Sequence, residues 1–148
     1  AMLWCAEEKI FLAADQVLAK ISPNVSVWAV DPDGDPLGLY IRSLKELRAL
    51  PEDAFVLPGH QLPFYGLHER AGQLIAHHEQ RCAMISEAAR TRPHCSADFV
   101  PVLFPRALDP HQMSFAFSEA LAHVNYMLGK GELVWDEPLG GVRRVKAA

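Results

Sequence analysis

One long amphipathic helix constrains the fold of this chain more than any other feature. Apolar side chains recur at alternating steps of three and four residues between Leu67 and Ala89, which is the spacing of one helical face. A short apolar run at residues 54–57 precedes this helix and ends in the turn Pro58-Gly59-His60. Because a strand that leads into a long helix is a building unit of layered folds, we expect an α/β (α+β) architecture.

The region before this strand predicts a hairpin, a long loop and a second helix. Apolar runs at residues 2–5 and 9–12 flank Ala6-Glu7-Glu8, which is the pattern of a β-hairpin. Residues 13–34 hold no long periodic run, and a loop of that length in a compact domain is usually functional. Asp35-Pro36 then suits a helix start, and the apolar stripe that follows is Leu37, Ile41, Leu44 and Leu47.

After Pro93 the pattern changes to that of a small helical module. We expect Ser96 to cap a short helix at residues 97–104, and Asp109 to cap a longer one with Gln112 at its third position. The expected buried stripe of the longer helix is Met113, Phe117, Leu121, Val124 and Leu128. Apolar runs at 133–135 and 142–145 then predict a hairpin. This order is typical of a winged helix, so we predict two domains, residues 1–92 and 93–148.

Composition excludes several classes of protein. Half of the 148 residues are hydrophobic and 22% are charged, which does not fit a disordered chain. The net charge of −4 excludes a strongly basic nucleic-acid surface as a bulk feature. Neither a membrane-spanning apolar run nor a secretory signal is visible, and the three cysteines form no CxxC pair. These features favour a cytoplasmic protein with reduced thiols.

Asp15 and His60 are the candidate metal ligands. Each follows a predicted strand, Asp15 at the entry to the long loop and His60 in the Pro58-Gly59-His60 turn. Carboxylate and imidazole are ordinary ligands of zinc, manganese and iron, and strand ends hold ligands rigidly while leaving them open to substrate. From the residues alone, an Asp that forms a turn and a His on the surface are the alternative readings.

A wider set of motifs resembles a known family. The motifs are Ala14-Asp15-Gln16-Val17-Leu18, Asp33-Gly34-Asp35-Pro36-Leu37, Leu57-Pro58-Gly59-His60, His77-His78-Glu79-Gln80-Arg81 and Leu108-Asp109-Pro110-His111-Gln112. In this order they resemble the C-terminal portion of metallo-β-lactamase-fold metal-dependent hydrolases, in the branch with a winged-helix-like C-terminal domain. The resemblance implies half of an αββα sandwich and a site for two divalent metals, zinc first among them. In that site Asp15 would bridge both metals, and His60 would be the last histidine ligand.

The sequence also departs from this family. The motif H-x-H-x-D-H is absent, no histidine precedes His60, and Ala14 stands where the family usually has glycine. Because a lone Ala1 precedes Met2, we expect Met2 to be the native start of a truncated or partial hydrolase. The complete protein would use metal-activated water to hydrolyse an ester, thioester, lactone or phosphodiester in a small-molecule substrate. We expect this chain alone to be inactive and to bind no metal tightly.

The remaining expectations concern partners and the alternative function. In a monomer, the apolar inner face of half a sandwich would be exposed to water. We therefore expect either a homo-oligomer or an assembly with a missing N-terminal half. Nucleic acid is not an expected partner, because the helix at residues 112–128 has no Lys or Arg, and only the hairpin is basic, through Arg143, Arg144 and Lys146. The alternative is a non-catalytic binding or interaction module that uses the winged-helix-like domain.

We expect His77 and His78 to serve packing and hydrogen bonding rather than to bind one metal together, since the side chains of neighbouring helical residues diverge by about 100° around the helix axis.

Overall fold

The computed structural model describes all 148 residues, and its contacts divide the chain into two compact units. Unit 1 contains Ala1–Pro23 and Leu39–His77, and unit 2 contains Asn24–Gly38 and His78–Ala148. Neither unit is continuous along the chain, because the later part of the predicted loop and the residues up to Gly38 belong to unit 2, while Leu39–His77 belongs to unit 1. The domain division at residue 92 stays a prediction. None of the helices has the combination of length and hydropathy that a membrane span requires.

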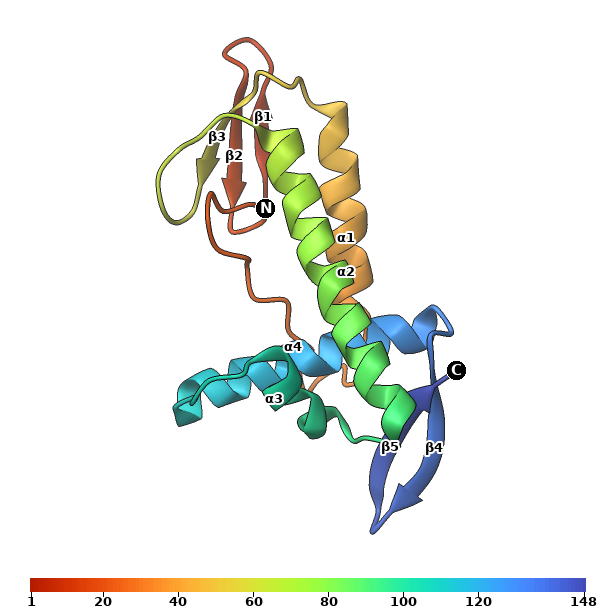
Figure 1. Cartoon of the computed structure of the whole chain (residues 1–148). Helices are drawn as coiled ribbons and strands as arrows, with labels where there is room; N and C mark the ends of the chain where they lie inside the picture. The colour runs from red at the N-terminus through yellow and green to blue at the C-terminus, as the bar shows by residue number, and fades with distance from the viewer. The chain divides into compact units, whose positions relative to one another are not determined.

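Unit 1 is built on a three-stranded sheet of order β1-β2-β3. The hairpin predicted from the sequence is formed by β1 (Leu3–Cys5) and β2 (Ile10–Ala14), which are antiparallel. β3 (Phe55–Pro58) lies parallel to β2, so the chain must cross over between them, and it does so through α1 (Pro36–Glu46) and a short 3₁₀ turn, Leu47–Ala49. α2 (Leu67–Thr91) follows β3 (Figure 1). The predicted strand–helix order is confirmed.

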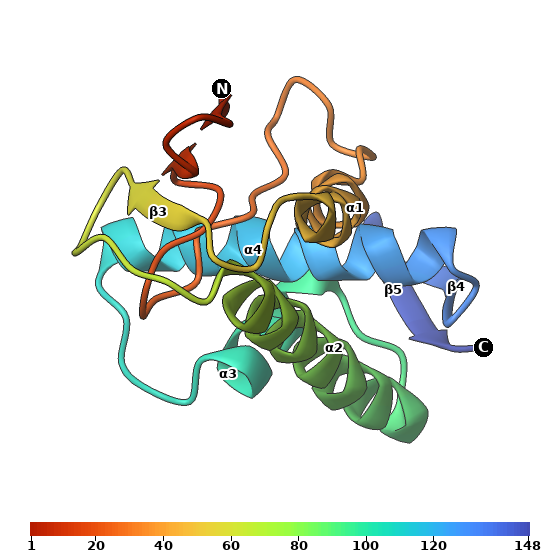
Figure 2. The same ribbon diagram turned by 90° about the horizontal axis from the view of Figure 1, so that it is seen from above.

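The two faces of this sheet differ in burial. Strand register places Trp4, Phe11 and Val56 in one row, and Phe11 and Val56 are buried. In the next row Leu3 is 64% exposed and Leu12 is 44% exposed. Figures 1 and 2 show α1 and the first turns of α2 beside the sheet. One helix layer on one sheet layer is half of an αββα sandwich, as predicted.

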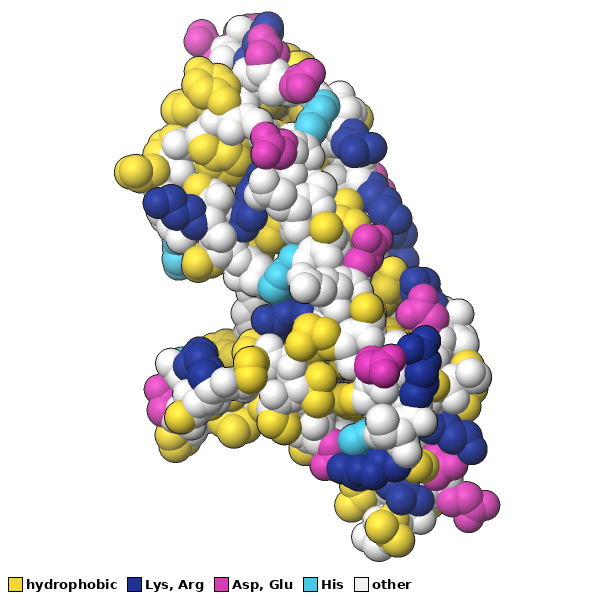
Figure 3. Space-filling view, viewed as in Figure 1, with side chains coloured by type: hydrophobic (Ala, Val, Ile, Leu, Met, Phe, Trp, Pro, Cys, Tyr) yellow, Lys and Arg dark blue, Asp and Glu magenta, His cyan; other side chains and the backbone are white.

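The uncovered side of the sheet, called the open face below, is apolar. It consists of the two outward rows of the register, Leu3, Leu12 and Leu57 in one and Cys5, Ile10 and Phe55 in the other. After β3 the chain returns to this side, where the ring of Tyr65 lies 4.8 Å from that of Phe55 between centroids. Hydrophobic side chains gather over these strands at the upper left of Figure 3.

Capping and an apolar stripe explain α1. The carboxylate of Asp35 accepts a hydrogen bond of 2.8 Å from the backbone N–H of Gly38, which satisfies one of the free donors at the helix start. The predicted stripe is buried along its whole length, at Leu37, Ile41, Leu44 and Leu47. Both parts of the sequence prediction are therefore confirmed.

Unit 2 contains the second half of α2, a 3₁₀ turn at Ser96–Phe99, α3 (Val100–Leu103), α4 (Pro110–Gly129) and the hairpin of β4 (Leu133–Leu139) and β5 (Val142–Ala147). Its core gathers side chains from all of these elements, among them Ile85, Phe99, Val124, Leu133 and Val145. His94 and Val145 exchange backbone hydrogen bonds of 2.9 and 2.8 Å, which fix the hairpin to the link after α2. Asp109 caps α4 as predicted, at 2.8 Å from the N–H of Gln112.

Two predictions for this unit are wrong. Ser96 does not cap the short helix: the cap position is Cys95, whose N–H donates to the Asp98 carboxylate at 3.0 Å. The buried face of α4 is also rotated from the predicted one, because Met113 and Phe117 are 45% and 41% exposed while Ala116 and Ala120 are buried. Small alanines allow the close approach of packed helices, whereas side-chain hydrophobicity had favoured the larger residues.

Candidate metal centre

The structure brings Asp15 and His60 together at one edge of the unit 1 sheet. Asp15 directly follows β2 and His60 comes two residues after β3, and the carboxyl ends of parallel strands share an edge. The distance from Asp15 Oδ1 to His60 Nδ1 is 3.4 Å, and the two side chains are 63% and 68% exposed. Their proximity is a structural fact, whereas their role as metal ligands stays a prediction.

A glycine permits this close approach. The backbone N–H of Gly59 donates to the carbonyl of Ala14 at 2.7 Å, so the turn after β3 lies against the end of β2. A Cβ at position 59 would lie 2.5 Å from Asp15 Oδ1 and 3.2 Å from the carbonyl carbon of Ala14. Any larger residue would therefore displace the Asp15 carboxylate or the backbone beside it.

Ala14 adopts the left-handed conformation, with φ of +46°. This region costs an L-amino acid roughly 1–2 kcal/mol and costs glycine little. The family usually has glycine before the aspartate, and this chain has Ala14 there. The backbone conformation at this position is one that glycine adopts with little strain. The turn keeps its shape despite the substitution.

Further hydrogen bonds join the loops that carry the two residues. Gln61, the residue after His60, accepts a hydrogen bond of 2.9 Å from the N–H of Lys20. From α2, the Arg70 guanidinium donates to the carbonyls of Leu18 and Ile21 at 2.7 and 2.9 Å. The sequence motif Gly66-Leu67-His68-Glu69-Arg70 is part of the family resemblance, but it gave Arg70 no role, because binding to backbone carbonyls has no residue-type signature.

Tyr40 holds the same loop from α1. Its hydroxyl donates to the carbonyl of Gln16 at 3.1 Å. Burial raises the pKa of Tyr40 well above its ordinary value, and the positive charge of Arg70 opposes that rise only in part. The phenol is therefore protonated at neutral pH and remains a hydrogen-bond donor to the loop that begins at Asp15.

The donor set fits part of a divalent metal centre. A carboxylate and an imidazole that face each other and are open to solvent match the oxygen and nitrogen ligands that zinc takes. A tetrahedral centre needs four donors, however, and this pair supplies two. The remaining positions would have to be filled by water or by donors outside this pair.

The histidines of unit 2 have structural partners. His78 and His123 are both fully buried, and His78 Nδ1 lies 3.1 Å from His123 Nε2. His123 Nδ1 lies 2.8 Å from the carbonyl oxygen of Glu119, and since that oxygen can only accept, His123 carries its proton on Nδ1. The predicted packing and hydrogen-bonding role is confirmed for His78.

The cations of the β4–β5 hairpin are all paired inside unit 2. Arg143 Nη1 lies 3.0 Å from the Asp33 carboxylate, while Arg144 and Lys146 contact Asp136 at 3.4 and 2.9 Å. The hydrogen bond from Lys146 lowers the pKa of Asp136, which keeps that carboxylate charged. This pairing favours packing of the hairpin on its own chain, and the expectation of no nucleic-acid partner stays a prediction.

Comparison with known proteins gives consistent results. The family model for the metallo-beta-lactamase-like C-terminal domain matches residues 82–148. A beta-lactamase domain protein from Burkholderia ambifaria superposes with a TM-score of 0.95 at 40% identity, over 99% of this chain and 44% of that one. A metallo-beta-lactamase family protein from Thermus thermophilus gives a TM-score of 0.83 at 32% identity, over 100% of this chain and 45% of that one. No curated protein gives a significant match.

The likeness extends along the whole chain, although the chain spans less than half the length of either of these two solved structures. The family model covers the second half of α2 and everything after it, which is most of unit 2. The solved structures add the β1–β3 sheet and the edge where Asp15 and His60 meet. The chain is therefore similar to the metallo-beta-lactamase-like proteins, residues 82–148 match their C-terminal domain, and its fold is that of their C-terminal portion.

Proposed function

We propose that this chain is part of a metal-dependent hydrolase, in which Asp15 and His60 hold a divalent metal, zinc first among the candidates. The observation that carries the proposal is the distance of 3.4 Å between the two side chains at the shared edge of β2 and β3. A metal bound there would lower the pKa of a coordinated water and polarise the bond to be broken. The substrate class remains an ester, thioester, lactone or phosphodiester.

The residues of this chain would orient the metal ligands. Gly59 lets the turn that carries His60 lie against Ala14, so the imidazole reaches the carboxylate of Asp15. Arg70 and Tyr40 hold the loop that leaves Asp15, which limits how far this carboxylate can move. Pre-set ligand positions lower the entropy cost of binding a metal.

Two ligands do not complete such a centre. We therefore propose that the chain alone binds metal weakly and turns over no substrate, and that further ligands come from another segment or polypeptide. The open face of the sheet is where a partner would dock, because Leu3 and Leu12 expose an apolar surface there. A second copy of this chain or a complementary half of the fold would cover it.

A metal titration tests this proposal. In the ¹⁵N-labelled chain, added zinc is expected to shift the ring nitrogen signals of His60 at concentrations that leave those of the other histidines unchanged. Asp15→Asn and His60→Gln should each weaken this response by at least tenfold. His111→Gln is the matched control, since His111 is exposed on α4 in unit 2. A zinc response centred on another histidine, or one that survives Asp15→Asn, would refute the assignment.

The alternative is a non-catalytic binding module, and it is favoured by a pocket of about 130 Å³ that is lined by unit 2 residues, among them Leu121, Asn125 and Trp135. The same titration separates the two functions. A module that has lost its catalytic role should show no preference for His60 over the other exposed histidines.

A further inference from the structure

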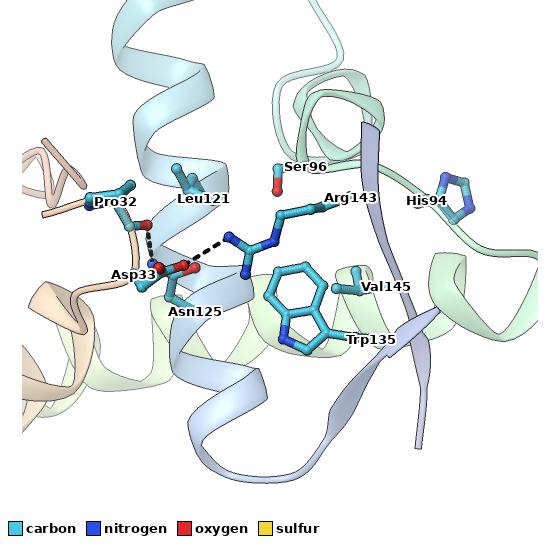
Figure 4. Close-up of a pocket in the computed structure, with 9 residues that line it drawn as sticks. All are labelled: Pro32, Asp33, His94, Ser96, Leu121, Asn125, Trp135, Arg143 and Val145. Atoms are coloured by element: carbon cyan, nitrogen blue, oxygen red, sulfur yellow. Dashed lines mark hydrogen bonds and ion pairs between the residues drawn. The ribbon is translucent and has the colours of Figure 1, made fainter. Parts of the chain in front are cut away.

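A pocket of about 130 Å³ lies wholly within unit 2. Figure 4 shows it between α4, the β4–β5 hairpin and the loop at Pro32–Asp33. Leu121, Trp135 and Val145 give it apolar walls. It contains neither Asp15 nor His60, so it is separate from the proposed metal centre and needs an explanation of its own.

The side-chain carbonyl of Asn125 is an acceptor for which the structure shows no donor in the chain. Its Nδ2 donates to the carbonyls of Pro32 and Gly34 at 3.0 and 2.9 Å. Both partners are carbonyl oxygens that can only accept, so the orientation of the amide group is fixed, with Oδ1 on the other side. The structure gives Oδ1 no hydrogen bond, although the residue is 9% exposed and lines the pocket. A carbonyl oxygen on a pocket wall can accept a hydrogen bond from a ligand that brings an N–H or O–H group.

Arg143 supplies donors on the same pocket. Its side chain extends from β5 over the Trp135 ring, 3.9 Å from the centroid, toward Asp33 (Figure 4). Nη1 pairs with Asp33 at 3.0 Å, which leaves the N–H groups on Nε and Nη2 without a partner. Ser96 adds a hydroxyl that makes no hydrogen bond.

Charge and hydrogen bonding restrict what can bind. The charges of Asp33 and Arg143 cancel, so the pocket offers no net attraction to an ion. A carboxylate would bring only acceptors to Asn125 Oδ1 and would lie near Asp33, while an ammonium group would be repelled by Arg143. The complement is a neutral group that carries a donor for Asn125 and an acceptor for Arg143.

We propose that this pocket binds a small, neutral, planar cyclic amide, with its N–H on Asn125 Oδ1 and its carbonyl on the free N–H groups of Arg143. The apolar ring would contact Leu121 and Trp135. The volume suits one ring, since a cavity of about 150 Å³ accommodates benzene. This site is independent of the metal centre and would remain if that assignment failed.

The probe for this site is 2-pyridone, a single ring with its N–H beside its carbonyl. Titrated into the ¹⁵N-labelled full chain, it should shift the indole N–H signal of Trp135 and leave those of Trp4 and Trp28 in place. A dissociation constant of about 1–10 mM is ordinary for a fragment of this size. N-methyl-2-pyridone lacks the donor and should bind at least tenfold more weakly.

Variants identify the pocket. Trp135→Leu removes one wall, and Ser96→Leu fills the space from a residue whose hydroxyl has no partner to lose. Each should weaken 2-pyridone at least tenfold. Trp28→Leu is the matched control, because Trp28 is exposed in the same unit and does not line the pocket, and it should leave binding unchanged. Equal affinity for the N-methyl compound, or no saturable response of Trp135 up to ~50 mM probe, would overturn the proposal.

Discussion

The two units of this chain differ in how completely they bury their apolar side chains. Unit 2 surrounds a core in which Ile85, Phe99 and Met127 are fully buried, and it pairs the Arg81 guanidinium with the Glu119 carboxylate at 2.5 Å. Unit 1 covers one face of its sheet and leaves the other apolar and exposed. A unit that closes its own core is self-sufficient, whereas a sheet with an open apolar face has the surface of an incomplete layer.

The largest expected effect tests the closed core of unit 2. Phe99→Ala removes a fully buried ring and should lower the free energy of unfolding by about 3–5 kcal/mol, measured by urea denaturation. Phe117→Ala is the matched control, because Phe117 is 41% exposed on α4, and it should cost less than about 1 kcal/mol. A cost for Phe117 equal to that for Phe99 would mean that α4 buries the face predicted from the sequence.

The second effect tests how closely the turn after β3 packs against the end of β2 in unit 1. Gly59→Ala places a methyl group 2.5 Å from Asp15 Oδ1, and the overpacking should cost about 1–3 kcal/mol on urea denaturation. It should also displace the His60 signals in NMR spectra. Gly72→Ala is the control, since a Cβ at position 72 meets nothing within 4 Å and alanine favours a helix. If Gly59→Ala proves as harmless as Gly72→Ala, the close approach of the two turns is wrong.

The third effect concerns the buried ion pair. Burial raises the pKa of Glu119 above its ordinary value of 4.5, and Arg81 opposes this only in part. A carboxyl with a raised pKa in the folded state binds more protons there than in the unfolded chain. The stability it contributes is therefore fully present below pH 4.5 and is lost as pH rises through the folded-state pKa.

Wild-type stability should accordingly fall relative to Glu119→Gln as pH rises from 4.5, by about 1.4 kcal/mol for each unit by which the pKa is raised. Urea denaturation of both proteins across this range measures the difference. A wild-type advantage that grows with pH would mean that attraction to Arg81 outweighs burial.

The smallest expected effect on stability is on the open face. Leu12→Ser should change the free energy of unfolding of a monomer by less than about 1 kcal/mol, because Leu12 is already 44% exposed. It should, however, weaken self-association in light scattering, since the substitution removes apolar surface from the docking face. If the wild-type protein keeps a monomer mass at all concentrations and melts in one sharp cooperative transition, the open face of the unit 1 sheet is not a docking surface.

Local signals in the sequence predicted local structure well. Asp35 and Asp109 cap the helices they were expected to cap, and the α1 stripe is buried, because these features depend on residues within a few turns of each other. The meeting of Asp15 and His60 was predictable because parallel strands end at one edge. The metal role of these residues came from family resemblance rather than from their spacing.

Interactions between distant segments were not predictable. Arg70 and Asn125 bind backbone carbonyls of a loop far away in sequence, and a carbonyl has no residue-type signature. The buried face of α4 was missed for a related reason: which face packs is decided by partner elements, and the alanines at 116 and 120 give a weak hydrophobic signal. The Arg143–Trp135–Asp33 arrangement likewise joins a loop and a hairpin that are far apart in sequence, since Arg143 and Asp33 are 110 residues apart.

Paramagnetic broadening by Mn²⁺ tests the central claim, that Asp15 and His60 donate to one metal, most directly. Added at low ratio to the ¹⁵N-labelled chain, Mn²⁺ should broaden the amide signals of residues 14–16 and 59–61 together, before any others, and Asp15→Asn should abolish both effects at once. Broadening that begins elsewhere, or that affects one of the two segments without the other, would contradict a shared centre.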